Sequence, residues 1–379
     1  MVLACVILVA GLAADEKPAR VPSPAAAATG IPGAEVTHDA LNSAFNYYGR
    51  WSPGRTAVSI NSGTFVEFSY TGNSCTLVFD VHGFAYFPGI FVQVDNGSVT
   101  KTALSADAST VVVTPTYNTL PNGNLPYPVP SSKHHLVRFW VATPSLYKTP
   151  LAGQQWTTLL GACKFKGARL AGGDLVPLPY RTNQIEFLGD SHTQGNRLLY
   201  TGTNDEIGNQ LPYANWPQLA ADLLGLTPVV TGFGGHSISG PATNGAPPAG
   251  EAFAYVHARA AWNPPVEPKV VVIYQGSNGA VPPEEFGNLY QAYLTTVRKG
   301  YSAALIFAIC PHNRPRYAAP IKGAVDALAD QRIVFLDYSS GVISKEEASD
   351  DPQAHFNPGG AVSMATRLAT DIASYLDKR

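Results

Sequence analysis

The first half of the chain consists of short hydrophobic runs that are mostly separated by turn residues. These runs occupy residues 56–63, 64–72, 75–83, 89–104, 109–117 and 134–143. They are rich in β-branched and aromatic residues, which is typical of strands, and Asn96-Gly97 between two alternating segments predicts a hairpin. Six or more strands with no helical stretch between them predict an all-β domain over residues 38–180, a β-sandwich of the jelly-roll type.

After residue 183 the pattern changes to near-continuous apolar runs that alternate with segments of helical spacing. The apolar runs occupy residues 184–190, 227–235, 269–278, 304–312 and 332–339, and the helical segments occupy residues 216–225, 284–300, 321–330 and 359–379. Such alternation is typical of a parallel sheet that helices cover on both faces. We therefore expect a three-layer, doubly wound α/β domain over residues 183–379.

The N-terminal residues have the pattern of an export signal. An apolar run from Val2 to Ala14 ends in small residues, although no positive charge precedes it, and it predicts a signal peptide over residues 1–14. The Ala- and Pro-rich residues 15–37 carry no periodic pattern and predict a linker. These features predict a secreted protein, extracellular or periplasmic.

Composition narrows the classes of partner. The 379 residues carry a net charge of −2 and only 14% charged residues, so no basic excess exists to bind nucleic acid. The N-terminal apolar run is too short to span a bilayer. We expect a monomer with no nucleic-acid or membrane partner. For Cys75 and Cys163, both a disulfide bridge and buried free thiols fit, and no cysteine spacing matches a zinc site.

Residues suited to acyl transfer follow the strands of the second half. Gly189-Asp190-Ser191 follows the first strand, residues 232–237 (GFGGHS) follow the second, and Gly276-Ser277-Asn278 follows the third, while His355 precedes the last helix. Ligands of parallel sheets bind at the carboxyl ends of the strands. A serine nucleophile needs a base, for which histidine is the usual choice, and backbone and amide N–H groups stabilise the oxyanion. Ser191 alone would equally fit a helix N-cap.

The order of these motifs resembles that of SGNH (GDSL-type) hydrolases. The segments "YYGRW", "HHLVRFWVAT", "ACKFKGARL" and "NQIEFLGDS" are in turn similar to carbohydrate esterase family 2, over roughly residues 44–378. That family pairs a jelly-roll domain with an SGNH domain and removes acetyl groups from plant polysaccharides such as xylan and mannan. The resemblance therefore implies the same two-domain fold and the same activity.

The resemblance also implies roles for single residues. Ser191 would be the nucleophile and His355 the general base. The oxyanion hole would combine the backbone N–H of Ser191, the side-chain amide of Asn278 and the backbone N–H of a glycine. That glycine is Gly234 by the esterase family's pattern and Gly235 by the pattern of the wider superfamily.

The acid that orients His355 stays open at this point. Many SGNH hydrolases carry Asp three residues before the histidine, where this chain has Pro352. Asp351 is the candidate for a triad, with Asp350 as its neighbour, and a Ser-His dyad is the alternative.

The remaining candidates are substrate contacts and supporting residues. Phe233, His236 and Tyr274 lie nearest the motifs and are the expected substrate-binding residues. Asp190 is expected to brace the turn through backbone hydrogen bonds, and His192 to line the cleft. No His, Cys, Asp and Glu cluster has metal-ligand spacing, so we expect no metal and no other cofactor.

The sequence as a whole predicts a secreted serine esterase that removes O-acetyl groups from plant polysaccharides or oligosaccharides through an acyl-serine intermediate. One alternative keeps the mechanism and changes the substrate to an aryl, feruloyl or short-chain lipid ester. Another is a carbohydrate-binding protein with a vestigial hydrolase cleft.

Overall fold

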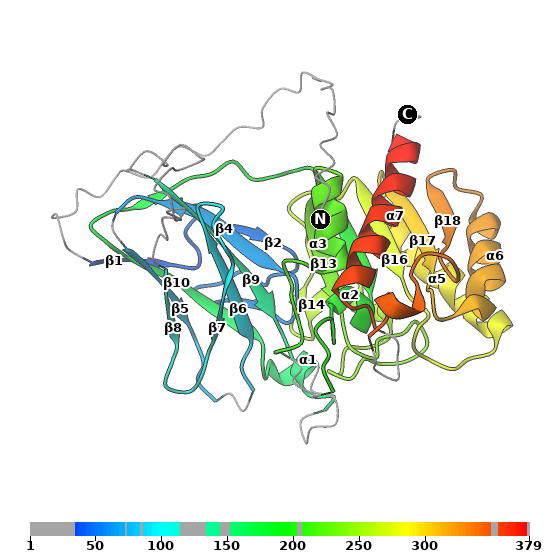
Figure 1. Cartoon of the computed structure of the whole chain (residues 1–379), viewed down its shortest axis with the longest axis horizontal. Coiled ribbons are helices and arrows are strands. Elements are labelled where there is room, and N and C mark those ends of the chain that lie inside the picture. The colour runs from blue at the N-terminus through cyan, green and yellow to red at the C-terminus, as the bar shows by residue number, and fades with distance from the viewer. Residues whose placement is uncertain are drawn as a thin grey trace.

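The computed structural model describes residues 35–72, 74–83, 86–113, 134–144, 152–202, 207–349 and 355–376. Figure 1 shows an all-β unit on the left and a parallel sheet with its helices on the right. The chain is therefore mixed α/β with a parallel sheet, as the hydrophobic pattern predicts. The expected signal peptide and most of the expected linker lie outside the described residues.

The all-β unit consists of two antiparallel sheets. In order across the first sheet lie β1 (Glu35–Asp39), β10 (Cys163–Ala171), β5 (Ser74–Phe79) and β8 (Thr110–Val113), with β3 (Ala57–Ser59) also on β10. In order across the second lie β11 (Leu175–Val176), β4 (Phe65–Tyr70), β9 (His135–Ala142), β6 (Gly89–Val94) and β7 (Thr100–Ala103), with β2 (Asn46–Tyr48) also on β4. One buried cluster takes side chains from both sheets, such as Leu77 and Phe165 from the first and Phe68 and Phe139 from the second. The two sheets therefore pack face to face as a sandwich.

The second unit is built on a parallel sheet. Its strands lie in the order β13 (Thr227–Gly232), β12 (Gln184–Gly189), β16 (Val270–Tyr274), β17 (Leu305–Cys310) and β18 (Ile333–Asp337). Its helices are α2 (Ser191–Gln194), α3 (Trp216–Leu223), α4 (Ala249–Ala252), α5 (Pro283–Gly300), α6 (Ala318–Leu328) and α7 (Pro358–Leu376), with 3₁₀ turns η1 (Pro315–Tyr317) and η2 (Lys345–Glu347). The first strand thus lies between the second and the third, so three motif-bearing strands are adjacent.

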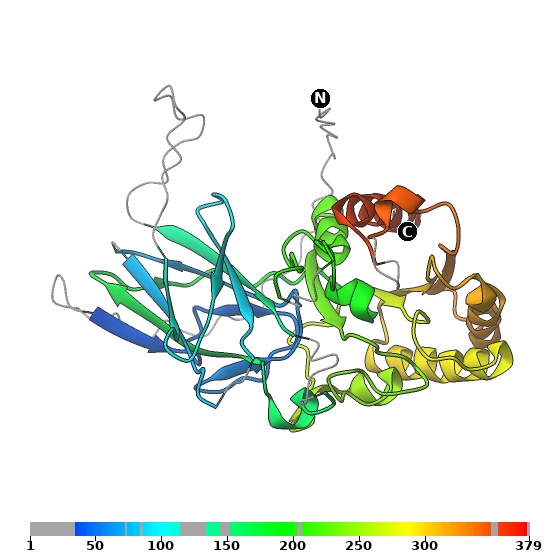
Figure 2. The ribbon, with the colours of Figure 1, turned by 60° about the horizontal axis from the view of Figure 1, so that its bottom comes forward.

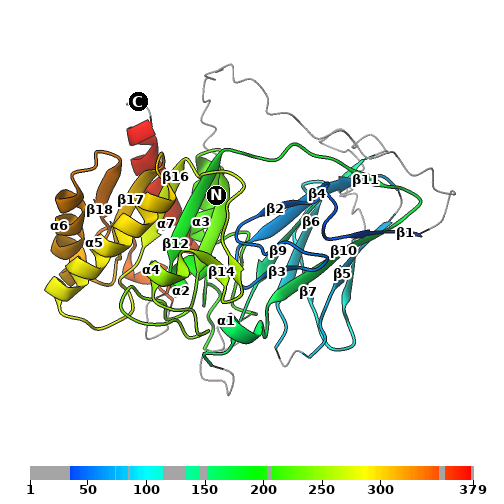
Figure 3. The same ribbon diagram turned by 180° about the vertical axis from the view of Figure 1, so that it is seen from behind.

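Helices cover both faces of this sheet. Along β16, Val270 and Val272 belong to a cluster with residues of α3 and α7, such as Trp216. The intervening Val271 and Ile273 belong to another cluster, with residues of α5 and α6. This alternation follows from the two-residue period of a strand. Figures 2 and 3 show α7 and α5 on opposite sides of the sheet.

The sandwich and the parallel-sheet unit share a buried interface. Arg50 follows β2 and is fully buried, and its Nε and Nη2 donate to Glu186 Oε1 on β12 at 3.1 and 2.9 Å. Its Nη1 donates to the backbone carbonyls of Phe253 and Tyr255. A charge pair without solvent on either side needs such complete pairing. The contact ties the sandwich directly to the strand that precedes Ser191.

Several expectations can be compared with the fold. The hairpin is confirmed: β6 pairs with β7, and Gly97 N donates to Val94 O across a turn in which Asp95 and Asn96 both have positive φ. The turn therefore centres one residue earlier than expected. Cys75, Cys163 and Cys310 are buried and free, so of the two alternatives the free thiols are observed.

The expected linker end at residue 37 differs from the structure. Strand β1 begins at Glu35 and pairs with β10 from Glu35↔Ala171 to Asp39↔Gly167. Its hydrogen-bond partner lies more than a hundred residues away, so local composition does not reveal it. A short helix, α1 (Gln155–Thr158), and a two-strand hairpin, β14 (Tyr255–His257) with β15 (Ala260–Ala261), are further elements that the pattern did not predict.

Within the described part of the chain, no helix combines the length and hydrophobicity that crossing a membrane requires.

Candidate active site

The candidate nucleophile lies in the turn between β12 and α2. Asp190 is the N-cap of α2, and its Oδ1 accepts the backbone N–H of His192 at 3.0 Å, so the expected bracing role of Asp190 is confirmed. Ser191 is the first residue of the helix and is 6% exposed. A Cβ on Gly189 would overlap the side chain of Thr193 and lie 2.9 Å from the carbonyl oxygen of Tyr274. Glycine is therefore the residue that lets this turn pack against β16.

His355 contacts Ser191 although it lies 164 positions later in the chain. Its Nε2 lies 2.8 Å from Ser191 Oγ, and its ring is 1% exposed. Ser349 N donates to His355 O at 2.6 Å, and Ala348 forms a β-bridge with Phe356. Backbone contacts with residues 348 and 349 thus hold the backbone at His355 and Phe356. The structure brings together the two residues on which the sequence argument depended.

The other motifs meet at the same edge of the sheet because the strands are parallel and in register. Gly189 pairs with Gly232 of β13 and with Tyr274 of β16. After β13, His236 N donates to Phe233 O at 3.1 Å, closing a turn in which Gly235 has a φ of 69°. A positive φ at this position is typical of glycine.

Asn278 lies on the loop after β16. Its Nδ2 donates to the backbone carbonyl of His236 at 3.3 Å, so the Asn278 loop and the glycine turn are in direct contact. Arg314, which the sequence analysis did not single out, donates from Nε and Nη2 to Ser277 O at 3.1 and 2.6 Å. Its position after β17, at the same edge of the sheet, was the available signal.

The electrostatics of the turn favour an ionised Asp190. Burial opposes ionisation, but the side-chain hydrogen bond of His192, the electrostatic attraction of its ring and its backbone hydrogen bond together outweigh burial and hold the pKa of Asp190 below its ordinary value. The carboxylate is completely buried. It therefore stabilises the turn as a charged group.

The expected substrate contacts are all buried. Phe233 is 3% exposed and packs edge-on against Trp156 of α1, and Tyr274 is fully buried with its hydroxyl 2.7 Å from His312 Nδ1. His236 is 4% exposed and its Nε2 lies 2.9 Å from Pro247 O. Burial lowers the pKa of His236 below 6.5. None of the three presents the open ring face on which a sugar would stack.

The residues of the sandwich that brace the site are ones that the sequence analysis did not identify. Gln194 of α2 donates from Nε2 to Thr143 O of the segment after β9 at 3.2 Å, and Trp156 supports the glycine turn through Phe233. Trp216 is fully buried at the start of α3.

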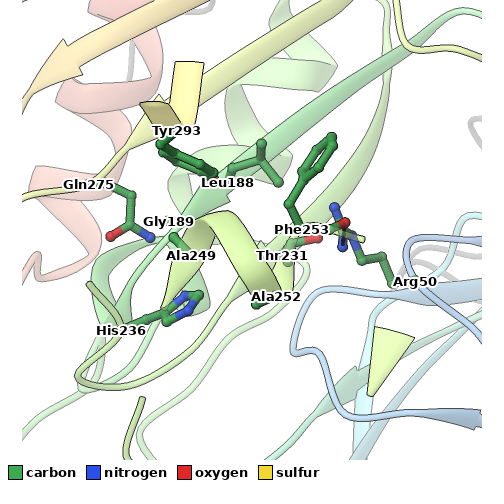
Figure 4. Close-up of a pocket in the computed structure, with 10 residues that line it drawn as sticks. All are labelled: Arg50, Leu188, Gly189, Thr231, His236, Ala249, Ala252, Phe253, Gln275 and Tyr293. Carbon is green, nitrogen blue, oxygen red and sulfur yellow. Dashed lines mark hydrogen bonds between the residues drawn. The ribbon is translucent and has the colours of Figure 1, made fainter. Parts of the chain in front are cut away.

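A small cavity lies beside the turn. It measures about 10 Å³ and lies among Gly189, His236 and Gln275, with Arg50 at the interface side; Figure 4 shows this arrangement. That volume is about the space one water molecule needs. The cavity is therefore too small for an acetyl group or a sugar.

The remaining expectations concern the triad acid and a metal site. Asp351 and Asp350, the candidates for the triad acid, lie outside the described residues. Across the described ranges, no group of three or more His, Cys, Asp or Glu side chains is arranged to hold a metal ion.

Solved structures similar to this chain include family 2 carbohydrate esterases. One from Cellvibrio japonicus matches with a TM-score of 0.73 and 17% identity over 91% of this chain and 99% of that chain. One from Clostridium thermocellum, in complex with cellohexaose, matches with a TM-score of 0.69 and 19% identity over 88% of this chain and 99% of that chain. An acetyl xylan esterase from the rumen bacterium Butyrivibrio proteoclasticus matches with a TM-score of 0.71 and 13% identity over 90% of this chain and 99% of that chain.

No protein-family model and no curated protein sequence matches the chain. At these identities the structural similarity establishes the fold alone: the chain folds like family 2 carbohydrate esterases. The resemblance to this family is thereby confirmed at the level of the fold.

Proposed function

We propose that this protein is a serine esterase that removes acetyl groups from carbohydrates, with Ser191 as nucleophile and His355 as general base. The observation that carries the proposal is the 2.8 Å contact between Ser191 Oγ and His355 Nε2 at the carboxyl end of β12. A serine hydroxyl becomes an effective nucleophile when a base within this distance removes its proton. The fold shared with carbohydrate esterases supports the same reaction class.

In the first half of the reaction, Ser191 Oγ attacks the carbonyl carbon of the acetyl ester while His355 takes the hydroxyl proton. The negative charge on the carbonyl oxygen is stabilised by the backbone N–H of Ser191, the backbone N–H of Gly234 or Gly235 and the side-chain amide of Asn278. The bond to the sugar oxygen then breaks, and His355 returns its proton to that oxygen. The sugar leaves with a free hydroxyl group, and an acetyl-serine remains.

In the second half, His355 takes a proton from water as the water oxygen attacks the acetyl-serine carbonyl. The same N–H donors stabilise the second oxyanion. The bond to Ser191 Oγ breaks, and the proton on His355 returns to it. The products are the resting enzyme and acetic acid, which releases its remaining proton to solvent and becomes acetate.

Asp351 is the candidate to orient His355, and a Ser-His dyad is the alternative. The Asp351→Ala variant distinguishes the two because loss of an orienting carboxylate lowers kcat by about 10⁴-fold in a triad. A loss smaller than about tenfold indicates the dyad. Asp350→Ala is the matched control, one position away in the chain.

The proposal extends to the finer features of the sequence analysis. The substrate is an O-acetylated plant polysaccharide or oligosaccharide such as xylan or mannan. The sandwich is a jelly-roll domain, and residues 183–379 form a doubly wound SGNH domain. The protein is secreted and acts as a monomer without a cofactor.

The decisive experiment measures acetate release from acetylated xylan and acetylated glucomannan by the wild type and by Ser191→Ala. Loss of release in Ser191→Ala, with full release by the exposed-site control Ser302→Ala, supports the proposal. Cleavage of an aryl acetate but of neither polymer would keep the mechanism and reject the polysaccharide. Carbohydrate binding without turnover of any ester would indicate the vestigial binding protein instead.

A further inference from the structure

His192 follows the candidate nucleophile directly, yet it does not line an open cleft. Its side chain is buried, at 3% exposure. The imidazole of His192 lies parallel to that of His355, with ring centroids 4.6 Å apart and an interplanar angle of 23°. The ring beside the nucleophile is therefore stacked on the ring of the base.

Contacts hold His192 in this position from several sides. Asp190 Oδ1 lies 3.2 Å from His192 Nδ1 and also accepts the backbone N–H of His192. Trp216 Nε1 donates to the backbone carbonyl of His192 at 2.9 Å. The ring therefore has little freedom to leave the stack.

The same contacts favour one tautomer of His192. An ionised carboxylate only accepts hydrogen bonds, so in the contact with Asp190 the hydrogen lies on Nδ1. Nε2 is buried and has no hydrogen-bond partner among the described residues. A hydrogen on Nε2 would be an unpaired buried donor, which is costly. The geometry therefore favours the tautomer that carries its hydrogen on Nδ1.

The groups around His192 come from four segments. Besides Asp190 and His355, three rings surround it, with centroid distances to the His192 ring of 5.8 Å for Tyr274 of β16 and 5.2 Å each for His312 after β17 and Phe356 before α7. Burial raises the pKa of Tyr274 well above 10, so its hydroxyl stays uncharged. His312 meets His192 edge to face and is bound to Tyr274. The negative charge beside His192 is that of Asp190.

A neutral aromatic ring stacked on a cation stabilises that cation through its π-electrons. In the proposed reaction His355 becomes a cation when it takes the proton of Ser191. The face of His192, with the ionised Asp190 behind it, lies where this positive charge develops. The stack also limits rotation of His355 and so preserves its alignment with Ser191 Oγ.

We infer that His192 is a positioning residue for His355: its ring keeps the base aligned with Ser191 and stabilises the imidazolium that forms during acyl transfer. The inference rests on the proposed function and deepens it. It assigns a role to the residue that follows Gly-Asp-Ser in this chain.

The experiment compares three variants on 4-nitrophenyl acetate. His192→Phe keeps an aromatic ring and loses the link to Asp190, whereas His192→Leu and His192→Gln lose the ring. We expect His192→Leu and His192→Gln to lower kcat about tenfold at unchanged KM, the effect of a cation–π contact of ordinary strength. His192→Phe should recover kcat to within about threefold of the wild type.

The pH profile supplies a readout that a purely structural role would not move. Without the stacked ring the imidazolium is less stable, so His355 releases its proton more readily. The acidic limb of the kcat/KM profile should then move to lower pH in His192→Leu and His192→Gln, and not in His192→Phe.

Melting temperatures verify that the variants are folded. If His192→Leu fails to fold, the comparison of kcat between His192→Gln and His192→Phe tests the inference. Wild-type kcat in a folded variant without the ring would overturn the inference, as would an equal loss in His192→Phe and His192→Gln. Ser191→Ala, measured in parallel, distinguishes a failure of the proposed function from a failure of the role of His192. Full turnover by Ser191→Ala rejects the proposed function, whereas its inactivity beside unaffected His192 variants rejects only the role of His192.

Discussion

The Nε2 atom of His355 lies 2.8 Å from the Oγ atom of Ser191, although 164 positions separate the two residues in the chain. The sheet creates this contact. Ser191 follows β12 and therefore lies at one edge of the sheet. The imidazole of His355 lies at the same edge, and the hydrogen bond from Ser349 N to His355 O fixes the backbone there. The pair is therefore a property of the tertiary structure and is the basis of the predictions below.

The side-chain amide of Asn278 is expected to contribute to the chemical step. Asn278→Ala should lower kcat by about 10²- to 10³-fold, the usual effect of removing one oxyanion donor, with little change in KM. Steady-state kinetics on an aryl acetate measure both constants. Asn288→Ala, an exposed asparagine on α5, is the matched control and should retain wild-type kcat. An unchanged kcat in Asn278→Ala would exclude this amide from the oxyanion hole.

Arg314 is expected to act through the loop that carries Asn278. Arg314→Met removes both bonds to Ser277 O, and we expect a loss of roughly tenfold in kcat because small misplacements of aligned groups are costly. Arg314→Lys, which restores one donor, should recover part of the loss. The control is Arg367→Met, whose half-exposed guanidinium pairs with Asp371 on α7. Equal kinetics in Arg314→Met and wild type would show that the loop needs no such support.

The buried pair of Arg50 and Glu186 is expected to contribute strongly to stability. Arg50→Met leaves the Glu186 carboxylate buried and unpaired, which should lower the free energy of unfolding by about 3–5 kcal/mol. Urea unfolding measures this loss. The double variant Arg50→Met, Glu186→Leu should recover part of it, because the isolated charge is removed as well.

The matched control for that pair is Lys322→Met, which breaks the exposed ion pair with Asp326 on α6. A loss of no more than about 1 kcal/mol is expected there. If Arg50→Met proved as mild as this control, the interface between the sandwich and the parallel sheet would not depend on the pair.

His236 is expected to make stability depend on pH. Burial holds its pKa in the folded protein below 6.5, so the unfolded chain binds this proton more readily than the folded one. Its contribution to the free energy of unfolding is complete above pH 6.5 and is lost as the pH falls toward the folded pKa, with a slope of up to about 1.4 kcal/mol per pH unit.

Thermal unfolding between pH 8 and pH 5 tests this dependence. In His236→Gln the free energy of unfolding should fall less steeply below pH 6.5 than in the wild type, by up to about 1.4 kcal/mol per pH unit. A wild-type slope in His236→Gln would show that this histidine does not take up the proton.

Part of the molecule follows from local sequence. Alternating runs such as "FVQVDNGSVT" predict the strands and hairpin of the sandwich, because the two-residue period and the turn residues are local properties. Continuous runs such as "KVVVIY" predict the parallel sheet. Since parallel strands end at one edge, the positions of Ser191 and Asn278 directly after their strands predict a shared edge. His355 follows no strand, and only the resemblance in motif order predicted that it would join them.

Other features depend on contacts between distant segments. Phe233, His236 and Tyr274 looked like substrate contacts, but the sandwich and the neighbouring strands bury them. His192 was expected in the cleft and instead lies between Asp190 and His355. Its place is set by Trp216 and by the loop before α7.

The sequence by itself determined the two architectures and the residue types of the site, because hydrophobic period and motif order are written along the chain. Only the tertiary structure decided which face each side chain of the site presents. Burial and stacking come from partners such as Arg50, Trp156 and Trp216, whose distance in the chain leaves no local pattern to read.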